Sequence, residues 1–210
     1  MRSPPLRFVN FRGEGIRGLM IQSRPWLAGF PNAAGRPFRE VIAMIRPIQA
    51  DEVEIALEII NDAAQAYKGV IPPDCWEEPY MPREELLSEM AAGVNFLSFL
   101  ENGRILGVMG RQDLGEVTLI RHAYVRTTAQ RRGVGTRLLA NLRQEVSQPL
   151  LVGTWAAAWW AIRFYEQQGF KLVSPGEKDR LLGAYWTISP RQTETSVVLA
   201  DERWFNQGRL

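Results

Sequence analysis

Residues 130–135, which read QRRGVG, combine glycines and arginines in a way that suits the binding of an anion. Both glycines lack a Cβ atom, so the backbone can approach a ligand closely. The apolar periodicity that follows predicts a helix from Gly133, whose first N–H groups have no partner within the helix and lie at the positive end of its dipole. We therefore predict an anion site here, flanked by Arg131 and Arg132.

This segment alone is compatible with several phosphate ligands or with none. The Walker pattern is absent, because no Lys-Ser or Lys-Thr pair follows the glycines. A dinucleotide fingerprint needs a third glycine, and Arg137 stands near the place where it would fall. A tight strand-to-helix turn without a ligand is the remaining alternative.

The turn is predicted to join a strand to a helix. Residues 117–125 are rich in the β-branched, apolar and aromatic side chains that strands prefer. Residues 126–130 turn the chain, and the helix beyond has apolar side chains at helical spacing at Val134, Leu138, Leu139 and Leu142.

A second block, residues 161–170 (AIRFYEQQGF), follows about thirty residues later. Together the two blocks resemble the GNAT superfamily of N-acetyltransferases. In that superfamily a Q/R-x-x-G-x-G/A segment holds the pyrophosphate of acetyl-CoA, and an A-x-x-F-Y-E-x-x-G-F helix carries a tyrosine that faces the CoA sulfur. The resemblance covers residues 44–200 and says little about the substrate.

The resemblance implies an α/β (α+β) fold, with a mixed, mostly antiparallel central sheet flanked by helices. Two central strands, 117–125 and 150–155, would splay apart and admit the pantetheine arm of acetyl-CoA. The residues that it assigns to the cofactor are Tyr124, Val125, Gln130, Arg131, Arg132, Gly133, Val134, Gly135 and Thr136. Tyr165 takes the catalytic position.

Acetyl transfer to an amine would need three things from this site. The attacking amine, with a pKa of about 10 if it is lysine-like, must lose a proton. The oxyanion needs donors, for which the superfamily commonly uses a backbone N–H near Val125. The departing thiolate needs a proton, and we assign its donation to Tyr165, whose phenol stays protonated at neutral pH.

The general base is left unassigned. Its candidates are Glu116 and His122 near the central strand and Glu77 and Glu78 in an upstream loop. His122 is equally compatible with a structural role in the strand, because a catalytic histidine needs partners that the sequence does not reveal. A chain of water molecules could also replace a single base.

One position departs from the superfamily pattern. Ala158 stands where many members have an asparagine that bonds the pantetheine. Around it lie Trp155, Trp159 and Trp160. We expect at least one of these indoles to pack in the core, and the alternative is that Trp155 or Trp159 shapes a flat apolar pocket for the acceptor.

The loop at residues 67–82 contains four prolines, which exclude a regular helix or central strand. In the superfamily this segment commonly walls the acceptor site. Its acids, Asp74, Glu77 and Glu78, suggest a cationic amine as acceptor. The alternative is a structural loop packed by its own aromatic side chains.

Other patterns predict the remaining elements. An Asp51–Glu54 capping box would open the first helix, and Asn102-Gly103 would turn a hairpin. Gly107 and Gly110 suggest bulges or close backbone contact. The predicted strands are 44–48, 94–100, 104–112, 170–173 and 195–199, the further helices are 82–90, 158–168 and 179–186, and 201–210 would be a tail.

The composition of the chain limits the classes of protein to which it could belong. The 210 residues suit one domain. A single cysteine excludes a framework of disulfides within the chain. One cysteine and one histidine also argue against a zinc cluster, so we expect no metal. No apolar run approaches the ~20 residues that span a bilayer. The net charge is +2, but residues 44–210 are mildly acidic, which argues against nucleic-acid binding.

Residues 1–43 carry seven arginines, two glutamates and little periodicity. We expect a disordered N-terminal extension, or a natural start at Met44, with the domain at 44–200. The expected partners are acetyl-CoA and an amine acceptor, in the cytoplasm, with a homodimer left open. An amine N-acetyltransferase is the favoured function, and a non-catalytic acyl-CoA-binding sensor or regulatory module is the alternative.

Overall fold

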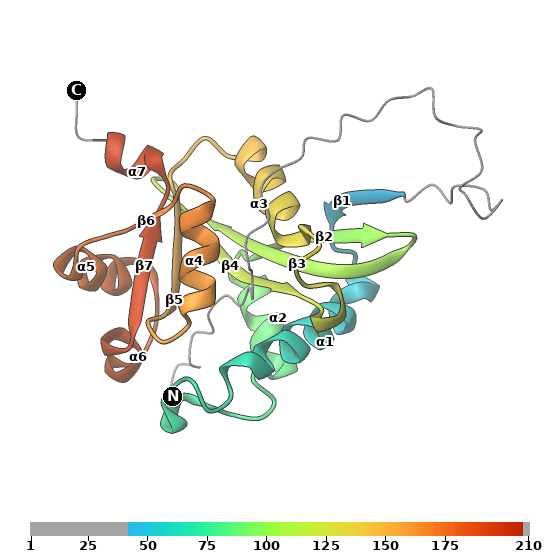
Figure 1. Cartoon of the computed structure of the whole chain (residues 1–210), viewed down its shortest axis with the longest axis horizontal. Helices are drawn as coiled ribbons and strands as arrows, with labels where there is room; N and C mark the ends of the chain where they lie inside the picture. The colour runs from blue at the N-terminus through green and yellow to red at the C-terminus, as the bar shows by residue number, and fades with distance from the viewer. Residues whose placement is uncertain (1–41, 208–210) are drawn as a thin grey trace.

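The computed structural model describes residues 42–207, so the expectations for residues 1–41 and for the last three residues lie outside the described part. Seven strands form one sheet in the order β1-β2-β3-β4-β5-β7-β6 (Figure 1). The strands are β1 (Ala43–Pro47), β2 (Asn95–Glu101), β3 (Arg104–Asp113), β4 (Thr118–Val125), β5 (Leu150–Trp155), β6 (Lys171–Leu172) and β7 (Ser196–Ala200). Only β4 and β5 pair in parallel, which confirms the mixed, mostly antiparallel sheet.

Helices cover both faces of this sheet. They are α1 (Val53–Ala64), α2 (Arg83–Ala91), α3 (Val134–Glu145), α4 (Trp159–Gln167), α5 (Pro175–Tyr185), α6 (Pro190–Glu194) and α7 (Glu202–Asn206). One core packs α1 and α2 on the first strands, a second packs α3 and α4 on the centre of the sheet, and a third packs α5 on β4, β5 and β7. In Figure 1, α1 and α2 lie under the first strands, and α5 and α6 lie at the other end beside β7.

The β2–β3 hairpin forms as its sequence predicts. Asn102 and Gly103 have φ of 50° and 78°, the left-handed values that this two-residue turn requires. The close backbone contacts predicted at the β3 glycines are also confirmed. A Cβ on Gly107 would lie 2.8 Å from Val134 Cγ1, and one on Gly110 would lie 2.9 Å from the Arg121 carbonyl oxygen.

The start of α1 differs from the predicted Asp51–Glu54 capping box. A 3-10 turn, Ala50–Glu52, precedes the helix, and Glu52 accepts a hydrogen bond of 2.9 Å from the Gln49 N–H. Glu54 instead pairs with Arg83 at 2.5 Å. The extra turn moves the capping acid two residues towards the N-terminus.

Both ends of the expected domain also differ. Strand β1 begins at Ala43, and the Ile42 carbonyl accepts a hydrogen bond from the Asn102 N–H. At the other end, the start of the expected tail is helix α7. The carboxylate of Asp201, which is 2% exposed, accepts from the Leu150 N–H at 3.2 Å, and Arg203 donates to the Val146 carbonyl at 2.6 Å.

Helix α5 is longer than predicted, and α6 was not predicted. Ser174 caps α5 by accepting from the Glu177 N–H, and Pro175 fits the first helical position, so the helix begins four residues before the expected Asp179. The segment between β6 and β7 is therefore largely helical. It packs through Leu181, Leu182 and Trp186 against the sheet.

Candidate active site

A gap between β4 and β5 lies at the centre of the sheet. The two strands pair in parallel only from Thr118–Leu150 to Ile120–Val152, although β4 continues to Val125 and β5 to Trp155. This divergence is the splay that the sequence predicts. The β3–β4 register also shifts here, and His122 adopts a left-handed φ of 45°, which is rare for a residue with a side chain.

The predicted anion turn lies at the end of β4. Arg131 and Gly133 have φ of 62° and 77°, and Gly133 is the N-cap of α3. The Arg137 N–H donates to the Gly133 carbonyl at 3.0 Å. The N–H groups of Val134, Gly135 and Thr136 therefore precede the first helical hydrogen bond, and such free N–H groups at a helix N-terminus suit an anion.

The turn is fixed to α1. Asp62 accepts from the Thr127 N–H at 2.8 Å and from the Thr127 hydroxyl at 3.0 Å. Arg126 donates to the Ile105 carbonyl at 3.1 Å and pairs with Glu58 at 3.3 Å. Sequence reasoning missed Asp62, because its partner is 65 residues away. The only sequence signal for Asp62 is that an acidic residue lies on one face of a predicted helix.

The two flanking arginines are placed differently. Arg132 pairs with Glu101 at the end of β2, so its charge is partly compensated. Arg131 is exposed and has the left-handed backbone. Of the two, Arg131 is the better-placed partner for an anion at this turn.

The end of β4 presents its backbone to the gap. The Arg126 N–H donates to the Leu106 carbonyl of β3 at 2.8 Å. Since backbone groups alternate along a strand, the N–H of Val125 points away from β3, towards β5. On that side the Val125 carbonyl accepts from the Gln130 side chain at 3.4 Å. Tyr124 is fully buried beside it.

Tyr165 extends from α4 into the second core. Its ring has 0% exposure and makes edge contacts with Phe164 and Phe170, with centroids 5.0 and 5.3 Å away. Its hydroxyl is buried and has no hydrogen-bond partner among the described residues. Burial raises the pKa of the phenol well above its ordinary value, so it is a proton donor at neutral pH. A buried hydroxyl without a partner is costly, and a hydrogen bond to a bound ligand would offset that cost.

Two of the three tryptophans pack in the core, and the third is exposed. Trp155 is 1% exposed and donates to the Tyr80 hydroxyl at 3.4 Å, and Trp160 is also buried. Trp159 is 60% exposed and contacts the edge of Trp160. Ala158 is fully buried.

The proline-rich loop packs against the first core. Tyr67, Ile71, Tyr80 and Met81 are buried, and Asn61 of α1 bonds both backbone groups of Met81, at 2.8 and 2.9 Å. The loop is therefore held against the first core, and part of its packing comes from its own aromatic side chains, as the structural alternative predicts.

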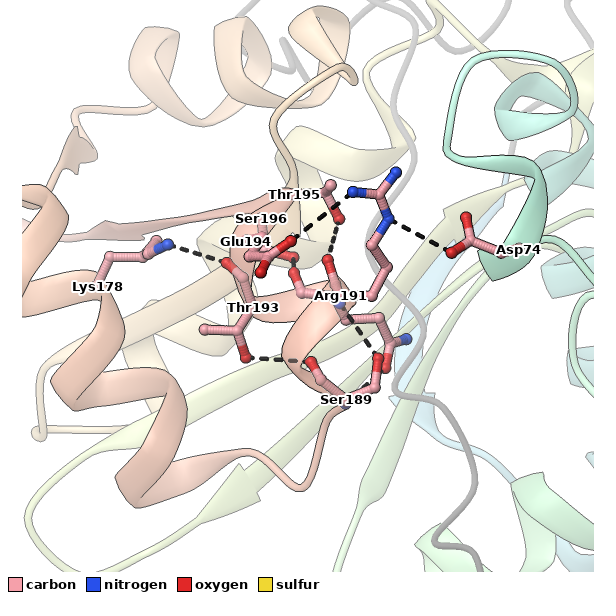
Figure 2. Close-up of polar contacts among 9 residues, drawn as sticks. Asp74, Lys178, Ser189, Arg191, Thr193, Glu194, Thr195 and Ser196 are labelled. Atoms are coloured by element: carbon pink, nitrogen blue, oxygen red, sulfur yellow. Dashed lines mark hydrogen bonds and ion pairs between the residues drawn. The ribbon is translucent and has the colours of Figure 1, made fainter.

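Two acids of this loop, Glu78 and Asp74, form ion pairs. Glu78 forms an ion pair with Lys68 at 2.8 Å, and the hydrogen bond from Lys68 lowers the pKa of the carboxyl. Asp74 pairs with Arg191 of α6 at 3.4 Å. Figure 2 shows Arg191 between Asp74 and Glu194 of its own helix. This contact, which the sequence did not suggest, joins the α5–α6 segment to the loop.

The four candidate bases differ in environment. Glu116, Glu77 and Glu78 are exposed. His122 is fully buried, stacks on Phe96, and contacts Glu89 of α2 through Nε2, while its Nδ1 has no hydrogen-bond partner among the described residues.

Glu89 anchors a buried charge cluster with that histidine. Arg121 lies 3.2 Å from the same carboxylate oxygen. Burial alone would raise the pKa of Glu89, but His122 and Arg121 outweigh it and lower the pKa to about 2. The cluster holds His122 in place, and sequence reasoning missed both Glu89 and Arg121.

Within residues 42–207, no three His, Cys, Asp or Glu side chains come together as a metal site. No helix in that range is long and apolar enough to cross a membrane.

Comparison with known proteins places the chain in a family. Residues 56–182, more than half of the chain, match the family model of the acetyltransferase (GNAT) domain. The chain therefore belongs to the GNAT acetyltransferase family. A search of curated protein sequences found no match.

Solved structures agree with this fold. The PaiA N-acetyltransferase of Thermoplasma acidophilum, crystallised with coenzyme A, is similar with a TM-score of 0.58 and 15% identity, over 76% of this chain and 98% of its own. The ribosomal-protein-S18-alanine N-acetyltransferase of Escherichia coli has a TM-score of 0.54 and 18% identity, over 76% and 93%. The N-acetylglutamate synthase of Neisseria gonorrhoeae, complexed with coenzyme A and N-acetyl-glutamate, has a TM-score of 0.54 and 16% identity, over 78% and 35%.

Proposed function

We propose that this protein is an acetyl-CoA-dependent N-acetyltransferase that acts on a primary amine of a small molecule or peptide. The observation that carries the proposal is the Tyr165 hydroxyl, buried without a hydrogen-bond partner among the described residues on the helix that follows β5. Family membership supports acyl transfer, and the similar structures that hold coenzyme A support the cosubstrate.

The anion turn would hold the pyrophosphate of that cosubstrate. The N–H groups of Val134, Gly135 and Thr136 supply donors and the positive end of a helix dipole, and Arg131 supplies a charge. Gln130 and Arg132 border the turn. The backbone carbonyl of Val125, which points away from β3, would accept from the pantetheine arm, with Tyr124 buried beside it.

The bound thioester supplies the acyl group. As the amine nitrogen bonds to the carbonyl carbon and the carbon–sulfur bond breaks, negative charge passes first to the carbonyl oxygen and then to the sulfur. The Val125 N–H would stabilise the first charge. Tyr165 gives its phenolic proton to the sulfur, and the proton that the amine loses replaces the one that Tyr165 gave up. We do not assign the residue that removes the proton from the amine.

The non-catalytic alternative rests on two observations. Ala158 lacks the amide that the superfamily commonly offers to pantetheine, and none of the four candidate bases is assigned as the catalytic one. A sensor would bind acyl-CoA and leave the thioester intact.

A thiol-release assay with acetyl-CoA and a panel of amines separates the two readings. We expect thiol release that depends on one class of amine, with one N-acetylated product per thiol by mass spectrometry. Micromolar binding of acetyl-CoA without release for any amine would favour the sensor. Absence of binding would overturn both.

A further inference from the structure

Strand β1 leaves one edge of the sheet open. Within the described residues it pairs with β2 alone, and it lies at the end of the sheet opposite β6 (Figure 1). The Ile42 carbonyl and the Ile48 N–H form hydrogen bonds with the β2 side of the sheet, at 2.9 and 3.0 Å. Since backbone groups alternate along a strand, the N–H and C=O groups of Ala43 and Ile45 point away from the sheet.

This open edge is apolar and carries no free charge. Met44 is 52% exposed and Ile42 is 67% exposed. Arg46, the one charged residue of β1, donates to both carboxylate oxygens of Glu52 at 2.7 and 2.6 Å, so its charge is directed at that acid. Soluble proteins commonly protect open edges with charges, bulges or covering segments, because unpaired strand groups recruit further strands. The edge of β1 has no such charge and is suited to a further strand.

A groove of about 400 Å³ lies beside this edge. It is lined by residues 43–45 of β1, by Phe99 of β2, and by one stripe of α3 that consists of Arg137, Ala140, Asn141 and Gln144. The spacing i, i+3, i+4, i+7 places these four side chains on one face of the helix. The Oδ1 atom of Asn141 is buried and has no hydrogen-bond partner within residues 42–207. The groove therefore offers an apolar floor and amide groups beside an open strand.

The open edge is complementary to a second copy of itself. A two-fold axis through Met44, perpendicular to the sheet, would place Ala43 opposite the partner's Ile45, and Ile45 opposite the partner's Ala43. Each of these two pairs could exchange both N–H···O bonds, as in any antiparallel ladder. Met44 would lie opposite the partner's Met44, with their Cα atoms about 4.5 Å apart.

The stripe of α3 is complementary to itself about the same axis. Because the stripe and residues 43–45 line one groove, the axis would set the two stripes side by side in opposite directions. Arg137 would then lie towards the partner's Gln144, whose amide oxygen is an acceptor, and Asn141 towards the partner's Asn141. The two arginines would be seven residues, or about 10 Å, apart along the helices, so their repulsion is largely screened.

We infer that this protein forms a two-fold homodimer through the open edge of β1, in which the two sheets join into one and the α3 stripes flank the junction. The backbone groups of Ala43 and Ile45 supply the hydrogen bonds, and the groove receives the partner's side chains. This inference does not depend on the proposed function.

Analytical ultracentrifugation of the full-length protein tests the dimer. We expect dimers at about 100 μM protein. Met44→Lys would set two ammonium groups opposite each other at the axis and should weaken the dimer by about tenfold or more, while the fold stays intact because Met44 is half exposed. Leu172→Lys is the matched control, because it makes the same change at a 45% exposed position of β6, at the other end of the sheet, and it should keep the wild-type dimer.

Cross-linking tests the register of the two β1 strands. Only a residue on the axis meets its own copy, and a Cα separation of about 4.5 Å suits a disulfide. Mild oxidation should therefore convert Met44→Cys into a covalent dimer and should leave Leu172→Cys and the wild-type protein, with its single Cys75, without a cross-link.

Three results would overturn the inference. The first is a wild-type protein that is monomeric at about 100 μM. The second is a dimer that Met44→Lys leaves intact or that Leu172→Lys weakens equally. The third is a dimer of Met44→Cys that oxidation does not cross-link.

Discussion

At the scale of single residues, the proposed site depends on the Tyr165 hydroxyl and on the N–H groups at the start of α3. The sequence motif predicts Tyr165 and the anion turn because both follow local spacing. It could not reveal that the Tyr165 hydroxyl lacks a partner, or that Arg132 pairs with Glu101, since these depend on contacts between distant segments. His122 shows the same limit, because Glu89 lies 33 residues away.

Replacing Tyr165 by phenylalanine removes only the proton donor. We expect kcat to fall by roughly 10²–10⁴-fold, the usual cost of losing a general acid, while acetyl-CoA affinity changes little. Steady-state kinetics and calorimetry measure the two quantities. Tyr185→Phe on α5 is the matched control and should retain wild-type turnover. If Tyr165→Phe keeps more than about a third of the wild-type kcat, with chemistry rate-limiting, the assigned role is wrong.

Replacing Thr136 by aspartate should affect folding stability and acetyl-CoA affinity in opposite directions. An acid in the first turn of α3 favours the helix dipole, by about 0.3–1 kcal/mol, and should leave the free energy of unfolding equal or higher. The same carboxylate would repel the pyrophosphate, so acetyl-CoA affinity should fall by about tenfold or more. Gly176→Asp, in the first turn of α5, is the control. Equal acetyl-CoA affinities of Thr136→Asp and Gly176→Asp would show that the N-terminus of α3 is not part of the cofactor site.

At the scale of elements, the sequence predicts those with strong local signals and misses those set by context. The hairpin at Asn102-Gly103 and strand β5 form where expected, because turn chemistry and a buried apolar run define them. Helix α6 spans only five residues and has little periodicity. Its place against the proline-rich loop depends on the ion pair of Arg191 with Asp74, which no local pattern encodes (Figure 2).

The Arg191–Asp74 pair offers a test of the loop as a wall of the acceptor site. Both side chains are more than half exposed, so the pair should contribute only about 0–1 kcal/mol to stability. Arg191→Ala should nevertheless let the loop move, raising KM for the amine a few-fold while KM for acetyl-CoA stays constant. Arg180→Ala on α5 removes another exposed ion pair as the control. Unchanged KM values for both substrates would make the contact purely structural.

At the scale of the whole molecule, one buried charge cluster links α2 to β4. Glu89 has its pKa lowered to about 2 from an ordinary value of 4.5, through His122 and Arg121 acting against burial. A depressed folded-state pKa stabilises the native state above the unfolded-state pKa, and this stabilisation is lost as the pH falls from about 4.5 towards 2. At ~1.36 kcal/mol per pKa unit, the loss is roughly 3 kcal/mol.

Denaturant unfolding across that pH range tests this linkage. The free energy of unfolding should fall more steeply below pH 4.5 for the wild-type protein than for Glu89→Gln, which has no titrating carboxyl at this place. Glu84→Gln, an exposed change on the same helix, is the control and should keep the wild-type slope. Parallel slopes for wild type and Glu89→Gln would show that the cluster does not control acid stability.

The placement of acyl-CoA in the β4–β5 gap is most directly tested by a crystal structure of this protein with coenzyme A. We predict the pyrophosphate at the N–H groups of Val134, Gly135 and Thr136, the pantetheine arm along the backbone of Val125, and the sulfur within hydrogen-bond reach of the Tyr165 hydroxyl. Coenzyme A bound elsewhere, or bound at the turn with its sulfur directed away from Tyr165, would contradict the account.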